Sequence, residues 1–116
     1  MKRLVILVLF LSFSLNSYAQ KTPTYVIKRA TLASEYISSK MSFNESQKKD
    51  LYTILLYKYD SNRKSIKGKG LSQEERQKIY KASFNETKKS LLEKFSMKDV
   101  NMINKLHREW QKNNKK

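Results

Sequence analysis

Side chains that commonly carry catalysis are scarce in this chain. His107 is the single histidine and there is no cysteine, so a Ser-His-Asp or Cys-His arrangement would have to use that one imidazole. Arg108 and Glu109 follow the histidine in a segment with helical periodicity, which favours an ordinary, partly exposed position on a helix. An imidazole could also sense pH near neutrality, but no neighbouring pattern singles out that role. We therefore expect that the protein is not an enzyme.

Residues that bind metals are equally sparse. Zinc and copper sites use several histidines, cysteines or clustered carboxylates. The adjacent acids of this chain, Glu74 and Glu75, lie at an expected helix start, where they suit the helix dipole. Met41, Met97 and Met102 could ligate copper(I), but they lie far apart at apolar positions, where core packing is the favoured role. We expect neither a metal nor another cofactor.

The N-terminus has the pattern of a secretory signal peptide. Lys2 and Arg3 precede an apolar run, and small residues lie three and one positions before a cleavage site between Ala19 and Gln20. The apolar core spans about a dozen residues, whereas a membrane-spanning helix needs roughly 20. A cleaved leader over residues 1–19 is therefore favoured over an uncleaved anchor, and the absence of cysteine excludes a lipid-modified lipoprotein. We expect a periplasmic protein.

The remaining chain has the size of one small domain. Removing 19 of the 116 residues leaves 97, and we place the folded domain over residues 20–110. No disulfide can form, because the chain has no cysteine. Small exported domains without disulfides often gain stability by oligomerisation, so we expect a homodimer.

The charge of this domain is strongly positive. Without the leader the chain keeps 23 basic and 10 acidic side chains, a formal charge of +13. Inside a cell such a charge would suggest nucleic acid, which we do not expect as the partner of an exported protein. Two interpretations remain open, peripheral contact with anionic envelope lipid or polymer, and lysines that only keep the surface solvated.

The scarcity of chain breakers predicts an all-α fold. Pro23 is the only proline, and Gly68 and Gly70 are the only glycines, so strands joined by tight turns are disfavoured. Apolar residues recur at steps of three and four, which is the helical period. We expect four helices in an elongated, hairpin-like bundle, with a loop at the glycines and a basic, disordered tail over residues 111–116. The expected helices span residues 25–40, 44–67, 72–94 and 96–110.

Two of the expected helix starts combine a phenylalanine with a capping residue. The cap is Asn or Ser, whose side chain accepts a hydrogen bond from a first-turn N–H group. An amide or acid follows three residues later and suits the same turn, and the preceding phenylalanine can act as a hydrophobic staple. The six residues are Phe43, Asn44 and Gln47 at one start, and Phe95, Ser96 and Asp99 at the other. A further start, with Ser72 and Glu75, has the spacing of a capping box.

Basic and aromatic side chains alternate along the helix expected at residues 44–67. Successive helix positions point around the cylinder, so at least one of the tyrosines should be exposed beside basic residues. Such a surface suits extended or unfolded polypeptide, while the alternative is that the tyrosines cover the edge of a small core. The candidate client-binding residues are Tyr52, Tyr57, Tyr59, Lys48, Lys49, Lys58 and Arg63.

The two phenylalanine-and-cap motifs make the chain resemble the Spy/CpxP family of small periplasmic chaperone-like proteins. That family has a repeated Leu-Thr-x-x-Gln motif at helix starts. The first motif here reads Phe43-Asn44-Glu45-Ser46-Gln47 and the second reads Phe95-Ser96-Met97-Lys98-Asp99. Gln47 matches the family, while Asn44 and Ser96 replace the capping threonine and keep its chemistry.

The resemblance implies a thin, curved, four-helix protomer that pairs into a cradle-shaped homodimer. It also implies ATP-independent binding of unfolded or partly folded polypeptides, or an accessory role that engages an envelope sensor protein under stress. The family offers no active site to carry over, and the His-rich arrangements of its metal-sensing relatives are absent here. The alternative function is an envelope-associated protein that binds anionic lipid or polymer through its basic surface.

Overall fold

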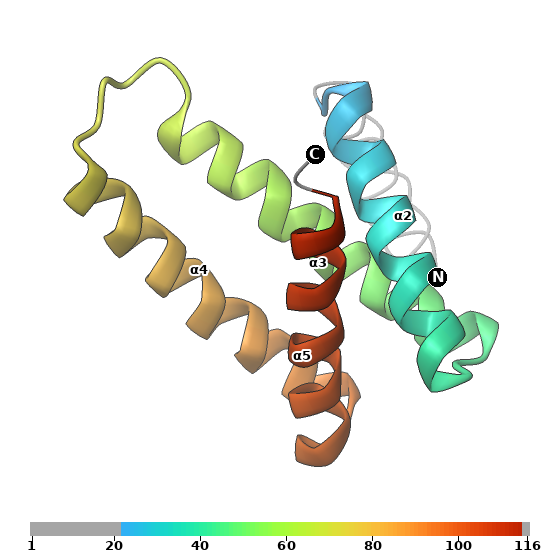
Figure 1. Ribbon diagram of the computed structural model, residues 1–116. Coiled ribbons are helices and arrows are strands. Elements are labelled where there is room, and N and C mark those ends of the chain that lie inside the picture. Colours follow the sequence, from blue (N-terminus) through green and yellow to red (C-terminus); the bar gives the residue numbers. More distant parts are fainter. Residues whose placement is uncertain (1–21, 115–116) are drawn as a thin grey trace, which may run out of the picture.

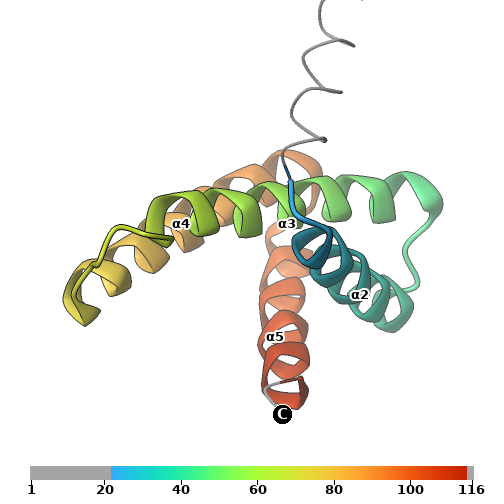
Figure 2. The same ribbon diagram turned by 90° about the horizontal axis from the view of Figure 1, so that it is seen from above.

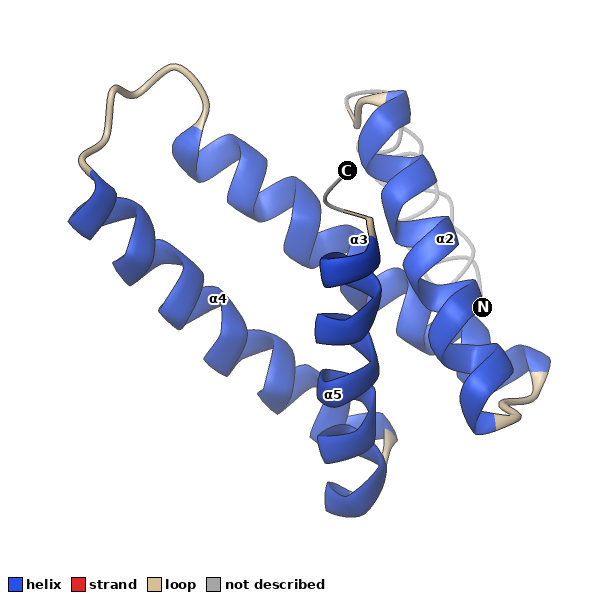
Figure 3. Ribbon diagram, viewed as in Figure 1, coloured by secondary structure: helices blue, strands red, loops and turns tan. Residues whose placement is uncertain are grey.

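A computed structural model describes residues 22–114, so the expected leader and the last two residues lie outside the described part. Within that part the chain forms four helices and no strand, which confirms the all-α prediction (Figures 1 and 3). The helices are α2 (Thr24–Met41), α3 (Glu45–Ile66), α4 (Gln73–Lys94) and α5 (Met97–Asn113).

The four helices form a ring in which each helix packs on two others. α2 packs against α3 and α5, and α4 packs against the same two helices. α3 and α4 make a hairpin whose loop contains Gly68 and Gly70, both in the left-handed region with φ of 73° and 57°, where a residue without Cβ is favoured. Figure 2 shows α2 and α5 extending from the same side of this hairpin.

The molecule is open rather than spherical. Its principal extents are 49 × 39 × 24 Å and its radius of gyration is 15.9 Å, compared with about 13 Å for a compact domain of 100 residues. The reason is that α2 and α5 cover only part of the hairpin (Figure 2). The loop end of the hairpin is therefore left without a helix over it.

The hydrophobic core lies where α2 and α5 meet the hairpin. α4 contributes Leu91 as its only buried apolar residue, and Phe95 follows at its C-terminal end. The part of α4 near the loop is therefore outside the core. The buried apolar residues are Val26, Ala30, Ala33, Ile37, Leu51, Leu55, Tyr59, Leu91, Phe95, Val100, Ile103, Leu106 and Trp110.

The expected helix caps are confirmed. The Asn44 side chain accepts a hydrogen bond from the backbone N–H of Gln47 at 2.8 Å, and the Asn44 N–H donates to the Gln47 side chain at 3.0 Å. Ser96 accepts from the backbone N–H of Asp99 at 3.2 Å. Together these bonds satisfy N–H groups that a helix start would otherwise leave without partners.

The two motifs also meet in space. The rings of Phe43 and Phe95 stack with their centroids 5.1 Å apart. The phenylalanines before the two caps therefore pack on each other, and the start of α3 is joined to the start of α5. The contact lies at the edge of the core, because Phe95 is buried and Phe43 is half-buried.

The expected disordered tail is wrong for its first three residues. α5 continues through Asn113, so residues 111–113 are helical. The physical reason lies in the last turn, where the buried Trp110 anchors the helix and Asn114 donates from its side chain to the Trp110 carbonyl at 2.8 Å. The apolar pattern ends at Trp110, but the hydrogen bonding does not.

Replacement of the α3 cap, Asn44→Ala, should lower the free energy of unfolding by about 1 kcal/mol, because it removes both bonds of the capping box. Urea denaturation followed by circular dichroism measures this loss. Asn85→Ala is the matched control, since Asn85 is an exposed residue inside α4 and alanine there should raise stability by at most about 0.5 kcal/mol. A loss at Asn44 no larger than the change at Asn85 would contradict the role of the cap.

Candidate functional site

A basic groove with aromatic walls opens between α2, α3 and α4. Its volume is about 750 Å³. Among the described residues, four cationic side chains line it and no carboxylate does. The cations are Arg29 from α2 and Lys58, Arg63 and Lys67 from α3. We call this cavity the basic groove.

The apolar wall of the basic groove comes largely from the uncovered part of α4. Tyr80 and Phe84 line the groove and are 51% and 44% exposed. Tyr80, Phe84, Leu91 and Phe95 follow one another at steps of four and seven residues, so they share one face of α4 and its C-terminal extension. Leu91 and Phe95 are buried in the core. The groove therefore uses the part of a core stripe that the protein leaves exposed.

Tyr59, which lines the floor of the basic groove, forms a buried polar pair with His107 of α5. The Tyr59 hydroxyl is hydrogen-bonded to Nε2 of His107, which is 5% exposed. Burial raises the pKa of Tyr59 to about 12. Burial also lowers the pKa of His107 to about 3, and the positive charges of Lys58 and Arg29 add to this lowering. Both residues are therefore uncharged near neutral pH. The expectation that His107 is a partly exposed helix residue is wrong, because the side chain is buried against Tyr59. The periodicity of α5 alone does not show which residue of another helix lies opposite His107.

Two cations, Arg29 and Lys58, line the groove together with Tyr59. The Arg29 guanidinium lies 4.8 Å from the centroid of the Tyr59 ring, in cation–π contact. Burial lowers the pKa of Lys58, and the like charge of Arg29 lowers it further. Within residues 22–114 neither cation makes an ion pair with a carboxylate.

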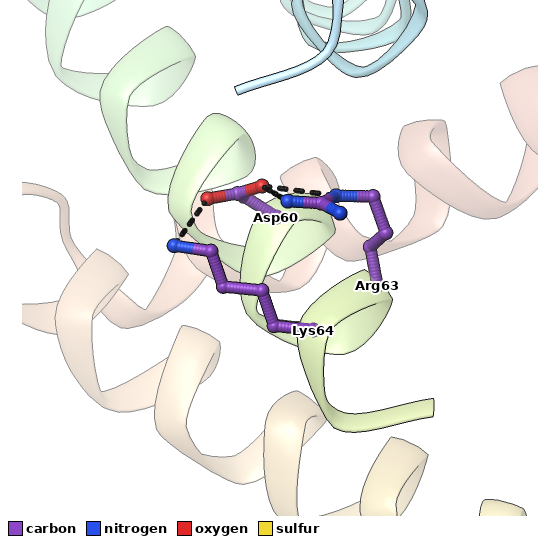
Figure 4. Close-up of polar contacts among 3 residues, drawn as sticks. All are labelled: Asp60, Arg63 and Lys64. Carbon is purple, nitrogen blue, oxygen red and sulfur yellow. Dashed lines mark hydrogen bonds and ion pairs between the residues drawn. The ribbon is translucent and has the colours of Figure 1, made fainter. Parts of the chain in front are cut away.

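Arg63 differs from these two because its charge is compensated. Asp60 is fully buried and forms ion pairs with Arg63 at 2.9 Å and with Lys64 at 3.1 Å (Figure 4). All three residues belong to α3, at spacings of three and four that bring their side chains together. Asp60 thus offsets the charge of Arg63, and the positive field of the groove comes mainly from Arg29, Lys58 and Lys67.

The structure brings together only part of the predicted client-binding set. Lys58, Tyr59 and Arg63 line the basic groove, although Tyr59 is buried and contributes mainly to its floor. Tyr57 is exposed and lines a different groove, of about 760 Å³, between α3 and α4. The remaining predicted residues line neither of these two grooves; they are Tyr52, which packs on the core, and Lys48 and Lys49.

Other residues of the groove were not expected from the sequence. Tyr25 and Arg29 come from α2, and Tyr80 and Phe84 come from α4. None of the four was among the predicted client-binding residues. The length of the apolar stripe on α4 could have indicated the exposure of Tyr80 and Phe84. A core this small cannot cover an apolar face that runs along the whole helix.

Metal and membrane sites are not indicated in the described part of the chain. Between residues 22 and 114 no three His, Asp or Glu side chains gather where a metal ion could be held. No helix in the same range combines the length and apolar character that a membrane span needs.

Comparison with protein-family models, curated proteins and solved structures finds no match to this chain. Its resemblance to the Spy/CpxP family therefore depends on the two helix-start motifs.

The buried histidine should make the protein sensitive to acid. The imidazole has an ordinary pKa of 6.5 when unfolded and about 3 when folded, so below pH 6.5 a proton binds on unfolding and favours the unfolded state. This residue should therefore remove about 2 kcal/mol of unfolding free energy between pH 7.5 and pH 5. The variant His107→Gln, which keeps a hydrogen-bonding side chain but does not titrate, should lack this loss. Urea denaturation at both pH values tests it, and an equal pH dependence of the two proteins would contradict it.

Proposed function

We propose that the protein is exported, with cleavage between Ala19 and Gln20, and acts in the periplasm as an ATP-independent chaperone-like or envelope-stress accessory protein. Its ligands are unfolded or partly folded polypeptides, or an envelope sensor protein. The basic groove is the observation that carries this proposal, and the resemblance of the motifs to the Spy/CpxP family supports it.

The groove has the properties that an unfolded chain requires of its receptor. Unfolded polypeptides expose apolar side chains together with backbone and charged groups, and they vary in sequence. Exposed aromatic rings offer a large contact area without a strict shape requirement. Lys67 is an exposed residue of the groove with a long side chain, and its charge adds attraction that acts over a distance of about 10 Å.

The same proposal includes a cradle-shaped homodimer. Exposed apolar residues support it, because the described chain leaves Leu92 on α4 and Met97 and Met102 on α5 accessible. The small core and the absence of disulfides add to the need for a partner. Two protomers joined through these residues would hold their basic grooves in one assembly.

Binding to anionic envelope lipid or polymer is the second candidate function. A further groove, between α2 and α5, favours it, because Lys28, Arg29, Arg108 and Lys112 line it without a carboxylate. Attraction of this kind is screened by salt. Vesicle or polymer binding that disappears at physiological salt would favour this candidate, while client binding that persists would favour the chaperone role.

At several-fold molar excess the protein should delay the aggregation of a chemically denatured client after dilution, measured by light scattering. Phe84→Ser should remove roughly half or more of this protection, because it takes a central ring from the groove. Leu32→Ser is the matched control, since Leu32 is 43% exposed, close to the 44% of Phe84, and lies outside the basic groove. The absence of any delay by the unaltered protein would refute the chaperone role, and equal losses in both variants would refute the groove as its surface.

A further inference from the structure

The cation pair in the basic groove is the feature that calls for a ligand. Arg29 and Lys58 both line the groove, burial and the charge of Arg29 lower the pKa of Lys58, and no described carboxylate forms an ion pair with either residue. Two like charges that line one groove repel each other, and a bound anion relieves that repulsion. Guanidinium and ammonium groups together supply several donors to a single carboxylate or phosphate.

The surroundings of the pair resemble a small-molecule site. Asn62 and Gln111 also line the groove and add uncharged amide groups beside the cations. On the α4 side, Tyr80 and Phe84 form an apolar wall. The volume of about 750 Å³ falls within the range of about 300–1,000 Å³ that is typical of ligand sites.

We propose that the basic groove binds a small amphiphilic anion, with its carboxylate or phosphate head at Arg29 and Lys58 and a single apolar chain along Tyr80 and Phe84. This proposal does not rest on polypeptide binding. A site for a head group alone would not need the exposed aromatic wall, and a purely apolar ligand would leave the cation pair uncompensated.

Net charge disfavours the occupants that the chain itself could supply. A second copy would add its own formal charge of +13 to an already positive site. Residues 1–21 carry no aspartate or glutamate, so a retained leader could cover the apolar wall but could not neutralise the cations. The proposed anion is therefore a separate small molecule.

Isothermal titration calorimetry of the purified protein, with its intact mass recorded, provides the test. The probes are dodecanoate and dodecyl phosphate below their micelle concentrations, which separate a carboxylate source from a phosphate source. We expect at least one of them to bind saturably, at about one per chain. Acetate and inorganic phosphate should bind at least about tenfold more weakly because they lack the apolar chain, and dodecyltrimethylammonium should not bind.

Two variants locate the head group. Lys58→Gln and Arg29→Gln should each weaken binding by about tenfold, the effect of losing a charged hydrogen bond. Lys49→Gln removes the same charge from an exposed position of α3 outside the groove and should leave the affinity within about twofold. Circular dichroism confirms that each variant is folded, and Lys58→Gln keeps the test valid if loss of the Arg29 contact with Tyr59 perturbs the core.

Three results would overturn the proposal. Equal binding of dodecyltrimethylammonium would show an apolar site without charge recognition, and equal binding of inorganic phosphate and dodecyl phosphate would show a simple anion site. Equal weakening by Lys49→Gln and Lys58→Gln would show diffuse attraction to the whole basic surface. None of these results alters the aggregation assay, which measures client protection and is judged separately.

Discussion

The hydrogen bond between Tyr59 and His107 connects two helices that do not pack as neighbours in the ring. α3 and α5 lie across from each other, each packed on α2 and α4, and this bond spans the space between them. It fixes where α5 lies over the hairpin, and with it which part of α4 is covered. Because both partners are neutral and buried, the bond satisfies polar groups that would otherwise be costly in a core this small.

The same neutral floor determines the electrostatics of the basic groove. A carboxylate below Arg29 and Lys58 would have neutralised them, but Tyr59 and His107 carry no charge near neutral pH. Asp60 follows Tyr59 in α3, but it is buried and forms ion pairs with Arg63 and Lys64. These ion pairs are needed because an unpaired buried carboxylate costs several kcal/mol. The groove is positive partly because the chain is rich in lysine, and partly because Asp60 is ion-paired with Arg63 and Lys64 and does not pair with Arg29 or Lys58.

Local chemistry was readable from the sequence, whereas contacts between helices were not. The caps at Asn44 and Ser96 were predictable because a cap and its partner lie three residues apart. The burial of His107 and the exposure of Phe84 depend on which helix lies opposite each residue, and periodicity alone does not contain that information. Ser42 illustrates the same limit. It ends α2 in the left-handed region, with a φ of 54°, and a serine does not indicate that conformation in the way that a glycine would.

The α4 stripe separates two physical roles within one apolar pattern. Leu91 and Phe95 are buried, so polar replacements there would remove apolar area from the core and unfold the protein more readily. Tyr80 and Phe84 remain about half exposed, and such residues contribute much less to the stability of the chain that carries them. A polar substitution at Phe84 can therefore alter binding without altering folding. The open ring makes this separation possible, because α2 and α5 stop short of the hairpin loop and leave the N-terminal half of the stripe facing the cations of α2 and α3.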